Sequence, residues 1–259
     1  MDLGLKGKVA LVTGASMGIG EATAIELAGE GCDLAICARH ADQLAKVRDQ
    51  VVAKGVRCVV AECDIRKPGD IAALMNEVGR AYGRLDILVN NAGAATHGTF
   101  ASLSDEQLLA DYELKILGQL RCTRAALALL EKSPAPRVIN VNAIAGRVVM
   151  PGLFATTTHR ASCFALSKAL AWELADRKIL VNSVNIGLVH TNQIERAHAR
   201  RAPDVPLEKF MAQAAQIVPL KRFGEPHEVS GLIAFLASDR AGFITGASID
   251  VGGGQGAHV

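Results

Sequence analysis

A glycine-rich turn near the start of the chain is the first place where residue types and spacing predict chemistry. The segment TGASMGIG, residues 13–20, follows the apolar run KVALVTG and opens a stretch with helical periodicity. Gly14, Gly18 and Gly20 permit a tight bend and a close approach of the backbone to a pyrophosphate, which the free amides of the helix start attract. A glycine triplet alone is a weak signal, but its place in the first strand–helix unit strengthens it. We therefore expect a dinucleotide phosphate here.

Short apolar runs alternate with longer amphipathic stretches along most of the chain. Strands are expected at residues 8–14, 32–38, 57–64, 85–93, 137–143, 179–187 and 246–253. Helices are expected at 18–31, 41–54, 68–82, 104–132, in the stretch that runs through Trp172 and Glu173, and at 227–238, with 188–226 irregular. Continuous apolar strands separated by helices indicate a parallel sheet covered on both faces. No linker, repeat or low-complexity tract divides residues 1–259, so we predict one α/β domain.

Composition excludes several classes of function. A net charge of +2 argues against a general binder of nucleic acids or membrane surfaces. The six cysteines show no C-x-x-C or zinc-like spacing, so we expect reduced, buried thiols, a reducing compartment and no metal site. No stretch reaches the roughly 20 apolar residues of a membrane span, and no signal peptide is evident. A soluble cytoplasmic protein is expected.

Several motifs together resemble those of the short-chain dehydrogenase/reductase family. They are TGxxxGxG at residues 13–20, GRLDILVNNAG at 83–93, ALAWEL at 169–174, RFGEPHEVSGLIAFLAS at 222–238 and ITGASIDVGGG at 244–254. The resemblance runs essentially from end to end. It implies a Rossmann-type doubly wound sheet, bound NAD(H) or NADP(H), and a homotetramer or homodimer.

The resemblance also implies which residues hold the cofactor. The glycine turn would hold the pyrophosphate, Asp64 and Ile65 would flank the adenine, and Thr191 would meet the nicotinamide amide. The complete expected set is Gly14, Ser16, Gly18, Ile19, Gly20, Arg39, Asp64, Ile65, Asn90, Gly93, Arg160 and Thr191.

The end of the second strand bears on the choice of cofactor. Ala38 stands where NAD-preferring relatives carry an aspartate, which would repel a 2′-phosphate. Arg39 follows and can pair with that phosphate through two parallel hydrogen bonds. Relatives that prefer NADP often add an arginine in the glycine turn, where this chain has Met17. We expect NADP(H) to be favoured over NAD(H).

The family's working pair is a tyrosine followed four residues later by a lysine, and TTTHRASCFALSK, residues 156–168, offers two registers without any tyrosine. AIAG at 143–146 matches the family's S-x-x-G, and the tyrosine position thirteen residues later is Thr156. Counting back seventeen residues from Glu173 in LAWE gives the same position. We therefore predict Thr156 and Arg160 at the catalytic positions. Phe164 and Lys168 become ordinary helix residues.

All four of the family's standard catalytic positions are altered in this register. Ala143 replaces the serine, and Lys115, in LKILG, stands where the family has an asparagine. Threonine is a poor acid, and arginine stays protonated, so neither Thr156 nor Arg160 can take over the tyrosine's role directly. Lys115 beside Arg160 would have a lowered pKa and could act as a general acid or base. His159 and His97 are further proton carriers near the site.

Three functions remain open. The first is an NADP(H)-dependent oxidoreductase on a carbonyl/alcohol pair, with a non-standard proton transfer. The second is a lyase, dehydratase or isomerase with enolate chemistry, since two cations would stabilise an enolate. The third is a non-catalytic, nucleotide-binding regulatory subunit. Residues 188–226 occupy the family's variable substrate lid, and their arginines, Arg196, Arg200 and Arg201, suit an anionic substrate or an acyl carrier.

Overall fold

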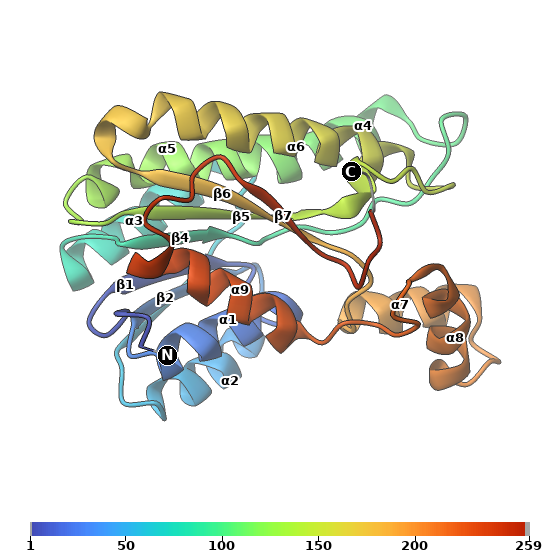
Figure 1. The fold of residues 1–259 in the computed structure, drawn as a ribbon, viewed down its shortest axis with the longest axis horizontal. Helices are drawn as coiled ribbons and strands as arrows, with labels where there is room; N and C mark the ends of the chain where they lie inside the picture. Colours follow the sequence, from blue (N-terminus) through green and yellow to red (C-terminus); the bar gives the residue numbers. More distant parts are fainter. Residues whose placement is uncertain (1, 257–259) are drawn as a thin grey trace.

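Seven parallel strands form one sheet in the computed structural model, which describes residues 2–256 (Figure 1). They are β1 (Val9–Thr13), β2 (Asp33–Ala38), β3 (Cys58–Glu62), β4 (Ile87–Asn90), β5 (Arg137–Ala143), β6 (Leu180–Ile186) and β7 (Ser248–Val251). Their order across the sheet is β3-β2-β1-β4-β5-β6-β7, and all neighbours are parallel. The predicted α/β fold with a doubly wound parallel sheet in one domain is confirmed.

Helices cover both faces of this sheet. The nine α-helices are α1 (Gly18–Gly29), α2 (Ala41–Val52), α3 (Pro68–Tyr82), α4 (Asp105–Tyr112), α5 (Gly118–Leu130), α6 (Phe154–Glu173), α7 (Asn192–Arg201), α8 (Leu207–Ala214) and α9 (Pro226–Ala237) in the described part of the chain. Figure 1 shows α1, α2 and α9 on one face, and α3, α5 and α6 on the other. This two-faced cover explains why the strands are continuously apolar.

Two hydrophobic cores result, one on each face of the sheet. Alternate residues of β1 point to opposite faces, so Ala10 and Val12 join the core under α1, α2 and α9. Val9 and Leu11 join the core under α3, α5 and α6. The sheet is therefore held rigidly from both sides, and the loops at its carboxyl edge start from fixed points.

The chain changes direction across the sheet at β1, whose neighbours are β2 and β4. In sheets of this type, ligands bind beyond the carboxyl ends of the strands at such a switch point. The glycine turn after β1 and the NNAG segment after β4 both lie there. The sequence motifs that predict chemistry are thus brought to one edge.

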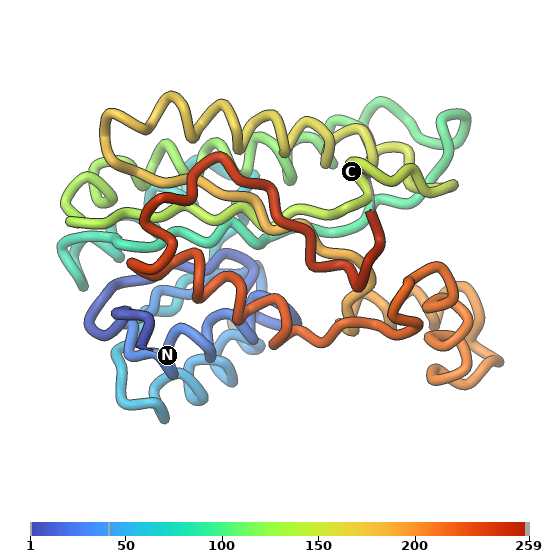
Figure 2. Tube along the Cα trace, viewed as in Figure 1, coloured from blue at the N-terminus to red at the C-terminus, as the bar shows by residue number. Residues whose placement is uncertain are grey.

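One expectation about secondary structure was wrong, and another needs a refinement. Residues 188–226 are not irregular, because α7 and α8 form in them and stand apart from the sheet beyond β6 (Figure 2). The long helix expected at 104–132 is present at residues 105–130, where α4, the π-helical segment η1 (Glu113–Leu117) and α5 follow one another without a break. This π-helical segment packs against α6.

Within residues 2–256, no helix has the length and apolarity needed to cross a bilayer. All six cysteines are unpaired, and five of them are buried. Within the same range, no cluster of three or more histidine, cysteine or acidic side chains could hold a metal ion.

Candidate active site and cofactor cradle

The turn between β1 and α1 is built from glycines that no other residue could replace without strain. Gly14 has a φ of +66°, and a Cβ there would lie 2.8 Å from the Cα of Ala92. Gly18 has a φ of +61° and starts α1, whose N-cap, Met17, makes no side-chain capping bond. The first amides of α1 are therefore free to bind an anion. The cradle fits a dinucleotide pyrophosphate.

The remaining residues of the predicted cofactor set line the same edge of the sheet. Ser16 is half-buried in the glycine turn, Ile19 is buried, and Arg39 is exposed at the end of β2. Asn90 is the last residue of β4. Its side-chain amide donates hydrogen bonds to Thr123 and Asn140, and its Oδ1 is buried without a hydrogen-bond partner.

Three predicted cofactor residues are engaged in contacts of their own. The Asp64 carboxylate accepts hydrogen bonds from the Arg66 guanidinium, so an adenine amino group would compete with Arg66 for it. Ile65 is buried and packs against Gly118, since a Cβ on that glycine would lie 2.6 Å from its Cδ1 atom. Thr191, the N-cap of α7, lies beside the glycine turn, because a Cβ on Gly18 would be 3.2 Å from its methyl group.

The π-helical segment places Lys115 in the interior of the protein. Its side chain is fully buried, with a relative exposure of 0%. Single π turns inside α-helices are rare and occur frequently at functional sites. The Nζ of Lys115 lies 2.7 Å from Oδ1 and 2.9 Å from Oδ2 of Asp111, one helical turn earlier. It also donates a hydrogen bond of 3.0 Å to Oγ1 of Thr156, which lies in the first turn of α6.

Thr156 ties this ion pair to the loop that follows β4. Its Oγ1 accepts a hydrogen bond of 3.1 Å from the amide of Thr96, and its hydroxyl donates one of 3.2 Å to the carbonyl of the same residue. The Thr96 hydroxyl donates in turn to Asp111. His159, one turn further along α6, places its Nδ1 2.7 Å from Asp111 Oδ2. We call Thr96, Asp111, Lys115, Thr156 and His159 the polar cluster.

Burial and charge shift the pKa values of the ion pair. The pKa of Lys115 is lowered to about 8. Burial is the largest cause and the positive charge of Arg160 the next, while Asp111 opposes the shift. Burial alone would raise the pKa of Asp111, but the charge and hydrogen bond of Lys115, with bonds from Thr96 and His159, lower it. Lys115 is therefore a protonated acid at neutral pH that gives up its proton more readily than an ordinary lysine.

Arg160 points from the same helix toward the end of β5. Its Nη1 donates hydrogen bonds of 3.1 Å to the Val141 carbonyl and to Oδ1 of Asn142. A Cβ on Gly93 would lie 2.8 Å from its Nη2, so the guanidinium covers that glycine. Its Nε is buried without a hydrogen-bond partner. An unsatisfied donor beside the loop after β4 fits a group that accepts hydrogen bonds, such as the ribose hydroxyls of a dinucleotide.

The two residues of the other register lie elsewhere. Phe164 is half-buried, with the guanidinium of Arg147 stacked 4.8 Å above its ring. Lys168 is exposed and donates to the carbonyl of Gly246. Of the two candidate registers, the one that contains Thr156 places its side chain in hydrogen-bond contact with Lys115. Ala143, at the end of β5, is half-buried and offers no polar side-chain atom.

Sequence reasoning missed Asp111 and Thr96. The spacing of Asp111 and Lys115 at i, i+4 is a visible signal, but such pairs usually stand on an exposed helix face. Only the packing of α4 against α6 shows that this pair is buried. Thr96 belongs to the loop after β4, and no motif singles it out.

A basic pair lies at the approach to the site. Arg201, the last residue of α7, places Nη2 2.8 Å from Nδ1 of His97, in the loop after β4. Burial, then the charges of Arg201 and Arg200, lower the pKa of His97, so its Nδ1 is free to accept this hydrogen bond. Gln193, at the other end of α7, accepts from the amide of Ala95. Helix α7 is thus joined to the loop after β4 at both of its ends.

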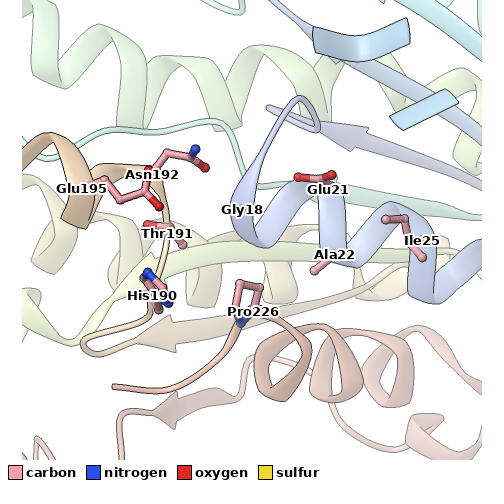
Figure 3. A pocket seen from close by; sticks show the side chains of 9 residues that line it. All are labelled: Gly18, Glu21, Ala22, Ile25, His190, Thr191, Asn192, Glu195 and Pro226. Carbon is pink, nitrogen blue, oxygen red and sulfur yellow. The ribbon is translucent and has the colours of Figure 1, made fainter. Parts of the chain in front are cut away.

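A cleft of about 310 Å³ lies between α1, residues 190–192 and the start of α9. Figure 3 shows the side chains that line it. It is lined by Glu21 of α1, by Glu195 of α7, and by His190 and Thr191 in the segment between β6 and α7. Two carboxylates would repel a phosphate, so this cleft does not suit the cofactor's charged end. The free amides of the glycine turn remain the phosphate cradle.

A doubly wound sheet with a glycine turn at its first strand–helix junction defines a Rossmann-type fold of the dinucleotide-binding class. The sequence profile of the family described as Enoyl-(Acyl carrier protein) reductase matches residues 14–255. Oxidoreductase UcpA of Salmonella typhimurium strain LT2 is 36% identical over 252 residues, which cover 97% of this chain and 95% of that protein.

Solved structures agree. L-Sorbose reductase of Gluconobacter frateurii, complexed with NADPH and L-sorbose, has a TM-score of 0.94 and 29% identity, with 100% of both chains covered. A short-chain oxidoreductase of Pseudomonas aeruginosa PAO1, described as containing an atypical catalytic center, has a TM-score of 0.92 and 34% identity, again over 100% of both chains. The chain belongs to the short-chain dehydrogenase/reductase family and is an oxidoreductase of that family.

Proposed function

We propose that this protein is an NADP(H)-dependent oxidoreductase on a carbonyl/alcohol pair in which Lys115 provides the proton through the hydroxyl of Thr156. The observation that carries the proposal is the 3.0 Å hydrogen bond from the buried Nζ of Lys115 to Thr156 Oγ1, at the family's tyrosine position. The atypical catalytic center of the Pseudomonas aeruginosa relative is a precedent for another arrangement on this fold.

A nicotinamide, when bound, would supply or accept the hydride. The residues that would hold the cofactor are those at the carboxyl edge of the sheet. The glycine turn at Gly14–Ile19 would bind the pyrophosphate through backbone amides, and Arg160, whose Nε has no partner, would bind the nicotinamide ribose. Arg39 beside Ala38 would pair with a 2′-phosphate. The NADPH bound by the Gluconobacter frateurii neighbour supports the same preference.

Thr156 can pass a proton on without becoming a free alkoxide. As the carbonyl oxygen of the substrate takes the hydrogen of the Thr156 hydroxyl, Oγ1 takes a hydrogen from the Lys115 ammonium along the existing bond. The threonine ends unchanged, the lysine ends neutral, and the substrate gains one proton. This answers the objection that threonine is a poor acid, because the acid is Lys115, with its pKa of about 8.

The substrate we propose is anionic. The pairing of Arg201 with a histidine instead of a carboxylate leaves positive charge at the approach to the site, and Arg196 and Arg200 are exposed on the same helix. Residues 188–226, with α7 and α8, would then form the lid over that substrate. For the assembled protein we propose a homotetramer or homodimer, and the exposed side chains of Trp172 (78%) and Phe243 (104%) are suited to a subunit interface.

The test combines binding with turnover. Calorimetry should show tighter binding of NADPH than of NADH. A panel of 2-oxo acids, 3-oxoacyl thioesters and neutral ketoses is then followed by NADPH absorbance and by product analysis. Lys115→Met should lower kcat by about 100-fold or more, the range for loss of a positioned acid. The matched control, Lys168→Met, removes an exposed lysine of α6 and should leave kcat unchanged.

Each other outcome has a definite reading. Full activity of the Lys115→Met protein would exclude Lys115 as the proton carrier. Conversion of a substrate without net change in NADPH absorbance would favour the lyase or isomerase function. Binding of NADPH without turnover of any compound would favour the non-catalytic, nucleotide-binding function.

A further inference from the structure

A fully buried proton donor has to be reloaded after each turnover. Lys115 has no exposed surface, and its Nζ contacts only Asp111 and Thr156 among the hydrogen-bonding groups described above. Thr156 leads toward the substrate side and to the backbone of Thr96. The other polar contact, Asp111, therefore points to the route by which a proton returns.

Exposure increases stepwise along that route. The side chains of Lys115 and Asp111 are both 0% exposed, whereas that of His159 is 15% exposed. Lys115 Nζ lies 2.9 Å from Asp111 Oδ2, and His159 Nδ1 lies 2.7 Å from the same oxygen. One carboxylate thus touches both a buried ammonium and an imidazole at the surface. The rings of Tyr112 and His159 pack edge to face at a centroid distance of 5.7 Å, which helps to fix the orientation of the imidazole.

We propose that His159 and Asp111 form the proton relay that reloads Lys115 from solvent. The proposal rests on the function proposed above only for its catalytic consequence. His159 takes a proton from water on its exposed nitrogen and releases the Nδ1 proton to Asp111. Asp111 passes a proton to the neutral Nζ of Lys115, so that one proton enters and the carboxylate ends as it began. In the oxidative direction the same steps run in reverse.

The other titratable groups around Lys115 do not offer this route. Arg160, on the same helix as His159, has no hydrogen-bond acceptor on its guanidinium, and its charge lowers the pKa of Lys115. Cys163 places Sγ 3.6 Å from the Lys115 carbonyl, and burial raises the pKa of its thiol, so it remains protonated. Imidazole, by contrast, exchanges protons near neutral pH.

The direct test is solvent exchange of the Lys115 Nζ protons, measured by ¹⁵N-correlated NMR on the cofactor-free protein. A relay makes this exchange much faster than burial alone permits. In His159→Gln, the amide can still donate a hydrogen bond to Asp111 but does not take up or release a proton, so exchange should slow by about 100-fold, the lower range for one positioned proton carrier. Asp111→Asn should slow it as well. His227→Gln, an exposed histidine on α9, is the control and should change nothing.

The sign of the effect separates a relay from a structural role. If His159 only supports packing, its loss loosens the cluster and Lys115 exchanges faster or at the same rate, which would overturn the proposal. A turnover readout follows in His159→Gly, where added imidazole should restore kcat in proportion to its concentration if the relay is real. Absence of such rescue in a folded, NADPH-binding variant would also count against it.

The two proposals fail separately. If Lys115→Met remains fully active while exchange of Lys115 still depends on His159, the relay stands and the proposed catalytic role falls. If Lys115→Met is inactive but the Lys115 Nζ protons exchange at the same rate in the wild type and in His159→Gln, the catalytic role stands and the relay falls.

Discussion

Replacing Lys115 by methionine should remove a pH dependence of folding stability whose sign is unusual for a lysine in an ion pair. Such a lysine ordinarily has a raised pKa, and its contribution to stability is lost at high pH. Here burial first, and Arg160 second, lower the pKa from 10.5 to about 8. Between these two values the unfolded chain binds a proton at this position that the folded chain does not. The free energy of unfolding therefore rises with pH across that window because of Lys115.

The expected size follows from the same shift. A difference of one pKa unit between the folded and unfolded states corresponds to about 1.4 kcal/mol. A pKa lowered from 10.5 to about 8 thus gives the wild type roughly 3 kcal/mol relative to Lys115→Met as the pH rises through that range. Buried thiols act in the opposite direction in both proteins, since burial raises the pKa of Cys32 and of Cys122 to about 12. The difference between the two proteins is therefore the quantity to measure.

The assay is urea unfolding of both proteins between about pH 7.5 and 10.5, a range set to span the two pKa values, with reductant present and the protein concentration fixed. The offset between the curves at low pH also contains the cost of leaving Asp111 without its partner, so the slope of the difference is decisive. Lys168→Met, an exposed lysine, should give a constant difference. A difference for Lys115→Met that is flat, or that falls with pH, would refute the claim that burial dominates this pair.

Three further outcomes are expected. Gly14→Ala should lower the free energy of unfolding and abolish NADPH binding in calorimetry, because its Cβ would meet Ala92 at a φ of +66°, whereas Gly29→Ala has open space and should be neutral or stabilising. Arg39→Ala should raise the Kd for NADPH by about tenfold, the loss of one charge-assisted contact, and leave that for NADH unchanged. Asn142→Ala should destabilise the fold by about 2 kcal/mol in urea unfolding, since it strands buried partners that include Arg160.

The framework of the fold could be predicted because its signals are local. β5, for instance, was expected at 137–143 and is found at Arg137–Ala143, since a strand buried on both faces reads as an apolar run. α7 could not be predicted in this way. Only Ala197 among its ten residues is buried, so no apolar stripe marks it as a helix. Contacts with the loop after β4, at Gln193 and Arg201, tie it to the body of the protein instead.

The candidate site divides in the same manner. Family spacing led to Lys115, Thr156 and Arg160, and the structure brings Lys115 within hydrogen-bond distance of Thr156. The π-helical turn that aims Lys115 inward has no local signature, because it depends on how η1 packs against α6. Asp111 was invisible for a related reason. On the sequence it looks like an exposed partner at i, i+4, and its burial comes from residues more than a dozen positions away along the chain.

The energetics of the polar cluster bear on whether the site is a relic. Moving a lysine and an aspartate out of water costs several kcal/mol for each ion, and apolar residues of similar volume often give equal or greater stability at such places. A buried ion pair is therefore weak evidence for a structural role. Here both oxygens of Asp111 accept hydrogen bonds, and the lysine beside it has a pKa lowered to about 8. A pocket that only bound a nucleotide would need the glycine cradle and a ribose contact, but not a lysine held ready to release its proton beside a hydroxyl. The cluster thus favours proton transfer over passive binding. Solvent exchange of the Lys115 Nζ protons and the kcat of Lys115→Met test that inference.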